Sequence, residues 1–500
     1  MEYLSSLILP SALFLLSSLC FILLFSINRR LPNTTTAATV IRGYRIIRNL
    51  LLFLKNSHRI IEWSAEVLST ASSSTITIAP IIFTSDPKVI EYIAKTRFDN
   101  YARVEEINAA LEDLLGSGIA NVNGEQWKLQ RKMASPEFSP NSLRSFLHDV
   151  VQYRIDERLV PLLRDASNSG RVVDLQDLLE RHAFDVICNL VLGVQPDCLC
   201  NKRGEGERFY KAFREATDIS IKRGLMTSVS TWRLKRSLNI GSERRLKESV
   251  ATVHEFVNNS VKLRTLQRNT GGDDSGGDFL SRFVHSDESL SDEFIRDVLI
   301  NFLVAGDTTP SALTWFFWNL SANPDIVTKI QKELKSIQNL HNPEAFTLSK
   351  LREMNYLHAA ISESMRLYPP IPLVPKKCLE DDVLPDGTPV QKGWMVFYNS
   401  YAMARKEAIW GEDCFEFRPE RWLDDEGVFK QRNAFEFPVF HAGPRACLGK
   451  ELAYLQMKAV ATSVLERFDV EVVEERAEFE LGLTLRMRGG LPVRIKERRV

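Results

Sequence analysis

One ten-residue stretch near the C-terminus constrains this chain more than any other. It is Phe440–Gly449, in which Cys447 stands between Gly443 and Gly449 and follows Arg445 by two positions. The apolar run after it predicts a helix, and N–H groups at a helix start favour negative charge such as that of a thiolate. The glycines let the backbone pass close to a flat, bulky group. The arginine offers a fork of donors that suits carboxylates on the same group.

Taken alone, Cys447 would be read as a small buried apolar residue, because that is the usual role of a single cysteine. A zinc site would need further Cys or His ligands at short spacing, and none lies near it. The full spacing Phe-x-x-Gly-x-Arg-x-Cys-x-Gly, however, resembles the cysteine-ligand signature of the cytochrome P450 family. The resemblance runs from about Asp86 to the C-terminus and implies haem, with Cys447 as the iron ligand and Phe440, Gly443, Arg445 and Gly449 around it.

The composition excludes some classes of partner. Acidic and basic residues balance at 64 each, which gives no indication of nucleic-acid binding. The 7 cysteines are scattered without a framework pattern, as expected for free thiols in a reducing compartment. Length alone would suggest about three domains. The resemblance instead implies one catalytic domain over residues 31–500, mainly α with small β-sheets.

The N-terminus predicts a membrane anchor. Residues 4–27 carry no charge and are followed by Arg29 and Arg30. As a helix this run would reach about 36 Å, enough to cross a bilayer. A cleaved signal peptide is the alternative, but the apolar run is long and lacks a clear cleavage site. We therefore expect residues 1–30 to be a single-pass signal anchor in the endoplasmic reticulum, with the remainder in the cytosol.

Two further positions are expected to contact the haem. Trp127 and Arg131 lie four apart on one face of a predicted helix, a spacing that by itself indicates only an ordinary amphipathic helix. In cytochrome P450s this pair contacts the haem propionates, and the resemblance implies the same role here. Lys376 occupies a place where the family often has a propionate-binding arginine.

A long apolar helix is predicted over residues 291–320, and a polar segment, Ala305–Pro310, interrupts it. Polar groups inside a buried helix are costly without partners. The resemblance implies that Asp307, Thr308 and Thr309 supply the acid and alcohol that help to protonate bound dioxygen. The segment is one residue shorter than the family pattern, so its register stays open. Pro310 has no N–H and so frees the carbonyl of Gly306, which together with a local kink would hold the water that proton delivery needs. The alternative is a proline kink with a structural purpose only.

Three charged residues are expected to support the fold. Glu363 and Arg366 are three apart on a predicted helix, and Arg421 follows in Pro419–Trp422. Pairs of this kind are common on solvated helices. The resemblance implies instead a buried triad that fixes geometry and retains haem, because losing one member would leave unpaired buried charge.

Two hairpins are predicted, one with its turn at Val383–Thr388 and one around Leu481–Leu485 with Gly489 and Gly490 after it. The resemblance implies that the stretch Ile371–Lys376, with Leu373 and Val374, and the tip of the last hairpin, with Leu483 and Leu485, line the substrate cavity. These side chains are apolar. Arg103 is a candidate to hold a substrate carboxylate, although a solvated arginine is the simpler interpretation.

Several stretches, among them Phe437–Arg445, Asp382–Thr388 and Trp315–Trp318, resemble the plant ω-hydroxylase branch. The resemblance implies a haem-thiolate monooxygenase that hydroxylates the terminal carbon of a fatty acid, using O2 and electrons from NADPH through a reductase. A sterol side chain and a jasmonoyl–amino acid are alternative substrates. The unusual Ala305–Pro310 segment also allows a haem-binding protein with little monooxygenase activity, or an isomerase-like enzyme that needs no dioxygen. The sequence does not fix the substrate or the oligomeric state.

Overall fold

The computed structural model describes residues 55–56, 59–71, 73–226, 229–269, 279–281, 290–340, 347–474 and 477–498. The expected anchor over residues 1–30 lies outside this part of the chain. None of the described helices has the length and apolar character needed to cross a bilayer.

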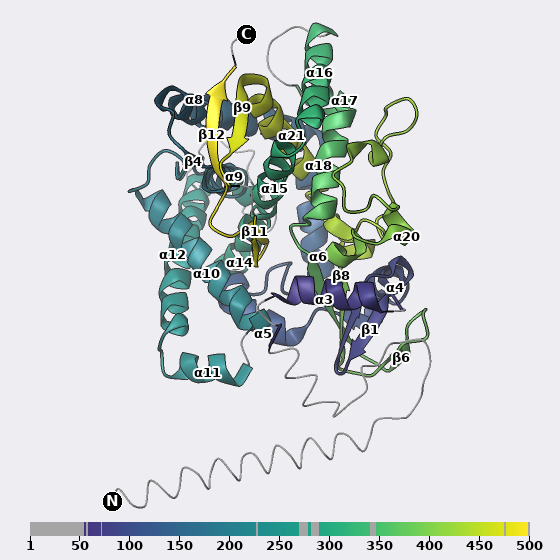
Figure 1. Cartoon of the computed structure of the whole chain (residues 1–500). Coiled ribbons are helices and arrows are strands. Elements are labelled where there is room, and N and C mark those ends of the chain that lie inside the picture. Colours follow the sequence, from purple (N-terminus) through teal and green to yellow (C-terminus); the bar gives the residue numbers. More distant parts are fainter. Residues whose placement is uncertain are drawn as a thin grey trace, which may run out of the picture.

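Helices make up most of the described chain, and small sheets lie at its edges, as the sequence predicts (Figure 1). The α-helices are α3 Ile60–Thr70, α4 Pro87–Glu91, α5 Glu105–Leu115, α6 Gly124–Ala134, α7 Pro140–Phe146, α8 Val160–Ser169, α9 Leu175–Leu192, α10 Glu205–Met226, α11 Val229–Ser237, α12 Ser242–Asn269, α14 Asp292–Ala305, α15 Thr308–Ser321, α16 Pro324–Leu340, α17 Leu348–Glu353, α18 Asn355–Leu367, α19 Ser400–Met403, α20 Glu407–Trp410 and α21 Lys450–Arg467.

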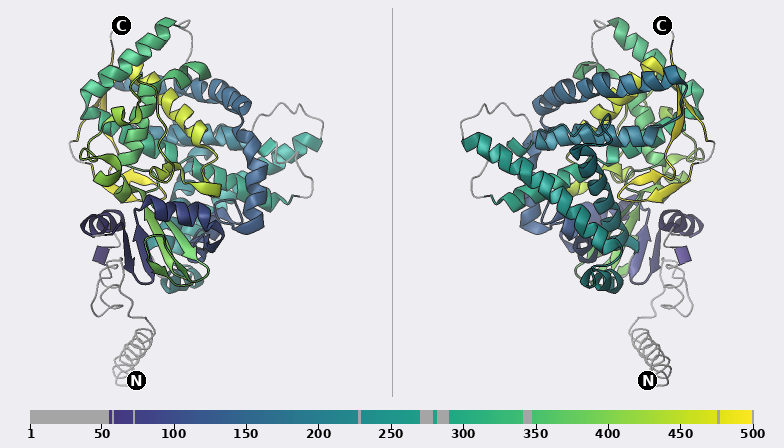
Figure 2. Two further views of the ribbon diagram at one scale, coloured as in Figure 1. Left: turned by 90° about the vertical axis from the view of Figure 1, so that its right-hand side faces the viewer. Right: turned by 90° about the vertical axis from the view of Figure 1, so that its left-hand side faces the viewer.

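The largest sheet has the strand order β1-β2-β8-β5-β3, in which β2 and β8 are parallel and the other neighbours antiparallel. It lies with α3 and α4 at one end of the molecule (Figures 1 and 2). The hairpins predicted around residues 383–388 and 481–485 are confirmed as β6–β7 and β10–β11. The strands are β1 Thr75–Ile78, β2 Ile81–Thr84, β3 Tyr101–Ala102, β4 Val173–Asp174, β5 Leu373–Cys378, β6 Asp382–Val383, β7 Pro389–Val390, β8 Met395–Asn399, β9 Phe468–Val472, β10 Phe479–Leu481, β11 Leu485–Met487 and β12 Pro492–Glu497.

The long helix expected over residues 291–320 is two helices, α14 and α15, separated by Gly306 and Asp307. Ser291 begins α14, and its side chain accepts a hydrogen bond from the N–H of Phe294. The last turn of α14 tightens, because Gly306 N–H donates to the carbonyl of Leu303. Pro310 falls in the first turn of α15, where N–H groups lack helical partners anyway. The chain thus accommodates a segment that is one residue shorter than the family pattern by ending one helix and starting another.

Each half of this interrupted helix is anchored separately. On α14, Asp297 accepts the N–H of Ser117 at 2.9 Å, and Asn301 accepts that of Ala120 at 2.8 Å. On α15, the Trp315 ring donates to the Leu485 carbonyl at 2.8 Å. These contacts set the position of both halves against the loop after α5 and against the β10–β11 hairpin.

The main hydrophobic core joins α15, α18 and α21, and a second cluster joins α9, α10, α12 and α14. Burial of α21 extends nearly all round the helix from Tyr454 to Leu465. Such a helix is held by packing on every side. Its first residue, Lys450, follows the cysteine loop directly, so the core fixes where that loop ends.

Candidate active site

The loop that carries Cys447 has a constrained backbone. The Cys447 N–H donates to the carbonyl of Phe440 at 2.8 Å, which closes the loop. Gly443 has φ +68°, and a Cβ on it would meet the carbonyl oxygen of Ala94 at 2.1 Å. Only glycine fits there. Phe440 packs on Tyr454 of α21 with ring centroids 5.2 Å apart, which ties the loop to the core.

The loop's donors do not by themselves ionise the thiol. Cys447 is an exposed residue, but desolvation by the protein around it raises the pKa of its thiol, while a backbone N–H at Gly449 and the charges of Arg131 and Lys450 lower that pKa by less. The stabilisation of a thiolate expected from the sequence is therefore present but smaller than the cost of desolvation. A coordinated metal ion is the factor that would deprotonate a sulfur placed in this way. Among the described residues, no group of three or more His, Cys, Asp or Glu side chains could hold a metal ion.

Beside this loop lies a cluster of cations around an aromatic ring. The guanidinium of Arg445 stands 4.5 Å from the centre of the Trp127 ring, and that of Arg131 stands 5.7 Å from it. The structure therefore brings together, from two distant segments, three of the four residues that the sequence assigned to the propionates. A hollow next to them is lined by Lys376, Arg445 and Arg103, among others.

In the part of the chain that the structure describes, no carboxylate pairs with Arg103, Lys376 or Arg445. Burial and neighbouring cations lower the pKa of Arg445 to about 9 and that of Lys376 to about 7, and burial lowers the pKa of Arg103 to about 10. Within the described chain, Nε of Arg103 and Nη1 of Arg445 are buried without a hydrogen-bond partner. Buried cations and unpaired donors of this kind are suited to carboxylates. The residues present thus fit a flat group that carries two propionates and lies over the sulfur.

The interruption between α14 and α15 presents polar groups next to apolar ones. Thr308 is half-buried and donates to the carbonyl of the exposed Ala305 at 3.1 Å, whereas Thr309 is buried. Asp307 is held by an ion pair with Arg214 at 3.2 Å. Of the two threonines, Thr308 is therefore the one on the open side, which favours the register with Asp307 and Thr308 as the acid and the alcohol.

The expected triad is buried and fully bonded. Glu363 is 0% exposed and pairs with Arg366 at 2.8 Å and with Arg421 at 2.8 Å. Trp422 donates to the same carboxylate at 2.9 Å. Arg366 also donates to the carbonyl of Cys414 at 2.7 Å. The triad thereby joins α18 to the loop before the cysteine segment.

The candidates for the substrate cavity separate into different environments. Val374 lines the hollow beside Lys376, but Leu373 packs against the two core clusters on either side of β5. Leu483 packs against the cluster of α9, α10 and α14, with Ile187 nearby in that cluster. Leu485 is 0% exposed in the main core, so its expected place on the cavity wall is wrong.

Comparison with known proteins agrees with this geometry. The family model described as Cytochrome P450 matches residues 43–486. The chain belongs to the cytochrome P450 family. It is 45% identical over 454 residues to Cytochrome P450 CYP94D108 of Paris polyphylla, covering 89% of this chain and 90% of that one. It is 42% identical to Cytochrome P450 94B1 of Arabidopsis thaliana (96% and 95% covered) and 40% identical to Cytochrome P450 94A1 of Vicia sativa (92% and 91%).

The match confirms the family and the plant branch expected from the sequence. This P450 is accordingly an oxidoreductase of the monooxygenase type, with haem as its cofactor and NADPH, through a reductase, as its source of electrons. The alternative of a haem-binding protein without such activity is not supported.

Sequence reasoning missed part of the cation cluster. Arg103 lines the same hollow as Lys376 and Arg445, so it lies where propionates are expected and is not a simple solvated arginine. His441, with φ +57°, faces these cations, which together with burial lower its pKa to about 3. Its Nδ1 is 2.9 Å from the hydroxyl of Tyr398. Arg103 has no local motif, whereas His441 lies within the cysteine signature and could have been noticed there.

Proposed function

We propose that this P450 hydroxylates the terminal carbon of an aliphatic chain, with a free fatty acid as the leading substrate. The observation that carries the proposal is the character of the site beside Thr308. Ala305 is exposed there, Ile187 and Leu483 belong to one apolar cluster, and the nearby Arg214 is already paired with carboxylates. An apolar end of a substrate is more favourable at this point than a charged one.

The proposed roles follow from the geometry. Cys447 would hold the haem iron, while Trp127, Arg131, Lys376 and Arg445 would hold the propionates. Phe440, Gly443 and Gly449 would shape the loop around the sulfur. When bound, haem supplies the activation of dioxygen and the transfer of oxygen to carbon.

The remaining roles concern the proton and the substrate. The Thr308 hydroxyl would orient a proton donor, and Asp307 would hold a proton-carrying network in place beside it. Val374 and Leu483 would contact the alkyl chain and present its terminal methyl group. This orientation is needed because C–H bonds further along the chain are weaker and more reactive.

The deciding experiment is product analysis with purified enzyme, reductase and NADPH. Lauric acid, a jasmonoyl–amino acid and a hydroxycholesterol would be offered in parallel. We expect terminal hydroxylation of lauric acid with the highest kcat/KM. Oxygen found only at in-chain or ring carbons would contradict terminal oxidation, and preference for either other compound would replace the fatty acid as the substrate.

We also propose that residues 1–30 anchor the enzyme in the endoplasmic reticulum membrane, with the catalytic part, residues 31–500, in the cytosol. The support is the uncharged run at residues 4–27 and the arginine pair that follows it. A chain lacking residues 1–30 should shift from the membrane pellet to the supernatant on centrifugation. The full chain in the supernatant would contradict the proposal.

A further inference from the structure

Five side chains form a closed ring of ion pairs and hydrogen bonds beside the interrupted helix. Asp307 pairs with Arg214 at 3.2 Å, and Arg214 pairs with Glu180 at 3.0 Å. Glu180 in turn receives two hydrogen bonds from Arg486, at 2.9 and 3.0 Å. Two residues earlier on the same hairpin, Thr484 donates to the other oxygen of Asp307 at 3.0 Å, which closes the ring.

The ring joins four elements that are far apart in the sequence. Glu180 comes from α9, Arg214 from α10, Asp307 from the start of α15, and the other two from the β10–β11 hairpin. Its members are largely buried, with 7% of the Glu180 side chain and 16% of that of Arg214 exposed. Burial raises the pKa of Glu180, while its two arginine partners oppose that shift. Ion pairs held in this degree of burial are sensitive to the loss of either partner.

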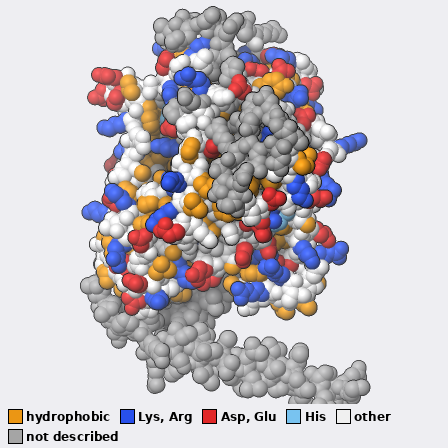
Figure 3. Space-filling model, turned by 180° about the vertical axis from the view of Figure 1, so that it is seen from behind, with side chains coloured by type: hydrophobic (Ala, Val, Ile, Leu, Met, Phe, Trp, Pro, Cys, Tyr) orange, Lys and Arg blue, Asp and Glu red, His pale blue; other side chains and the backbone are white. Residues whose placement is uncertain are grey.

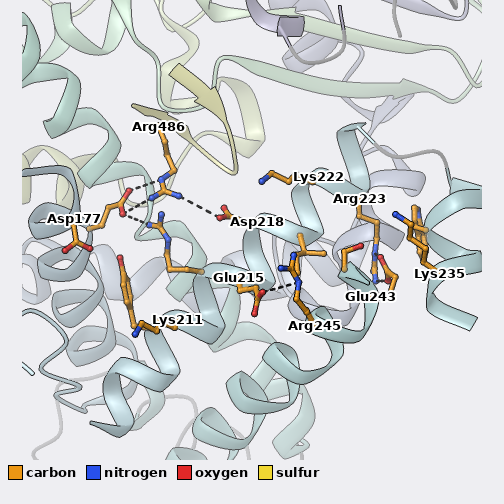
Figure 4. A pocket seen from close by; sticks show the side chains of 16 residues that line it. Asp177, Lys211, Glu215, Asp218, Lys222, Arg223, Lys235, Glu243, Arg245 and Arg486 are labelled. Atoms are coloured by element: carbon orange, nitrogen blue, oxygen red, sulfur yellow. Dashed lines mark hydrogen bonds and ion pairs between the residues drawn. The ribbon is translucent and has the colours of Figure 1, made fainter. Parts of the chain in front are cut away.

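Glu180, Arg214 and Arg486 of the ring line one part of a groove of about 530 Å³, whose other walls come from α10, α11 and α12. Figure 4 shows Arg486 reaching into this groove from the strand toward Asp218, which lies 3.8 Å away. The ring therefore separates the charged groove outside from the apolar cluster around Leu483.

The hairpin depends on such contacts for its order. It has two strands of three residues each, and a two-stranded ribbon is at best marginally stable by itself. The end of β11 next to the turn, where Leu485 pairs with Leu481, accepts hydrogen bonds from Ser311 and Trp315 at the Leu485 carbonyl. At its tip, the side chain of Thr484 is bonded to Asp307 of the ring, and Leu483 is the residue immediately before it.

Leu483 lies where a small displacement would matter. It packs in the same cluster as Ile187, and a Cβ on Gly306 would come within 3.0 Å of that isoleucine. The hairpin tip and the start of α15 are therefore adjacent, with the half-buried Thr308 only two residues from Gly306.

We propose that this ring determines which carbon is oxidised. By fixing the hairpin tip, it holds Leu483 as a wall that admits the alkyl chain end-on and keeps its inner carbons away. Arg486 and Thr484 are positioning residues that act through Leu483. The inference rests on the proposed terminal hydroxylation.

The test compares the products of Arg486→Gln and Thr484→Val with those of the native enzyme on lauric acid. In each variant we expect the ratio of in-chain to terminal alcohol to rise about fivefold, which corresponds to about 1 kcal/mol between the two transition states. Hydrogen exchange of the amides of residues 479–487 in the substrate-free holoenzyme should become about tenfold faster. Thr484→Ser keeps the hydroxyl and should restore the native ratio.

Arg488→Gln is the matched control, because Arg488 lies at the end of the same hairpin and forms an exposed pair with Glu478 at 2.7 Å. It should leave both product ratio and exchange unchanged. If Arg486→Gln does not fold, Thr484→Val decides. Native product ratios and native exchange in the folded variants would overturn the inference. Native enzyme that forms only in-chain products would instead overturn the proposed function.

Discussion

Cys447 lies in a loop whose own donors are too few to ionise it, so its role depends on the iron that it would bind. We expect Cys447→Ala to lose the long-wavelength Soret band that thiolate-ligated haem gives after reduction and addition of carbon monoxide. Cys200→Ala is the control, because Cys200 is an exposed cysteine elsewhere in the chain. Persistence of the band in Cys447→Ala would remove Cys447 as the ligand.

Thr308 and Thr309 differ in exposure, which predicts different effects of substitution. Thr308→Ala should raise the ratio of hydrogen peroxide to hydroxylated product about tenfold or more, because a group that takes part in proton transfer is lost. Thr309→Ala should change this coupling little. The measurement is NADPH consumed per product and per peroxide formed, at equal haem content. Stronger uncoupling in Thr309→Ala would reverse the assigned register.

The lowered pKa of Lys376 predicts that the stability of the haem-free protein depends on pH, and bound haem should suppress this dependence. Its folded pKa of about 7 lies below the ordinary lysine value, mainly because of burial. Between that pH and about 10.4 the unfolded chain binds more protons, so the stability of the haem-free protein should rise with pH. Lys376→Met should flatten this slope and stabilise the haem-free form in urea titrations near pH 7.

The same substitution should weaken haem retention, since a charged partner of a carboxylate is lost. We expect haem transfer to an acceptor protein to become about tenfold faster, as for a charge-assisted hydrogen bond. Lys377→Met is the control, because Lys377 pairs with Glu105 and Glu106. Equal effects of the two substitutions would contradict the assignment of Lys376 to the cofactor.

Among the elements, α18 is joined to the segment before the cysteine loop through Glu363. Glu363→Gln would leave two buried arginines without their shared partner and should cost about 3–5 kcal/mol of stability, with loss of haem. Glu420→Gln, which affects the more exposed pair with Lys329, should cost at most about 1 kcal/mol. Urea unfolding and haem content would measure both. Similar losses in the two variants would show that the triad has no special role.

The elements also show which contacts a sequence can predict. The cysteine loop was predictable because its residues lie within ten positions, whereas the triad followed only from the family resemblance, since Arg421 is far along the chain from Glu363 and Arg366. The ring of five side chains was not predictable, since Glu180, Arg214 and Arg486 each lie on a different element with an ordinary polar face. The break between α14 and α15 was predictable in part: the short segment indicated a disturbed helix, but not that Asp307 would be clamped by α10 and the hairpin.

At the scale of the molecule, the face in Figure 3 shows charges of both signs interspersed. We propose that the surface near the cysteine loop binds the acidic surface of the reductase through Lys128 and Lys132 of α6 and Lys450 at the start of α21. One of these is partly neutralised, because Lys128 pairs with Glu125 at 2.8 Å.

Substituting these three lysines with alanine should slow reduction by the reductase about tenfold at low salt and reduce its salt dependence, as expected for electrostatic steering. The measurement is stopped-flow reduction over a range of ionic strengths. Lys235, Lys247 and Lys262 on α11 and α12 form the control set, which should leave reduction unchanged. Salt-independent reduction of the native enzyme would exclude charge pairing as the basis of docking.

The separate anchoring of α14 and α15 has a consequence for how the length of this segment can change during evolution. Because neither half relies on the other for its register, Gly306–Asp307 is a seam at which the gene could lose a codon without shifting Asp297, Asn301 or Trp315 from their partners. A deletion one turn earlier or later would rotate an anchored face by about 100° and separate those partners. Among descendants of a common ancestor, changes of length in this helix should therefore be found at the seam and be absent from the turns on either side.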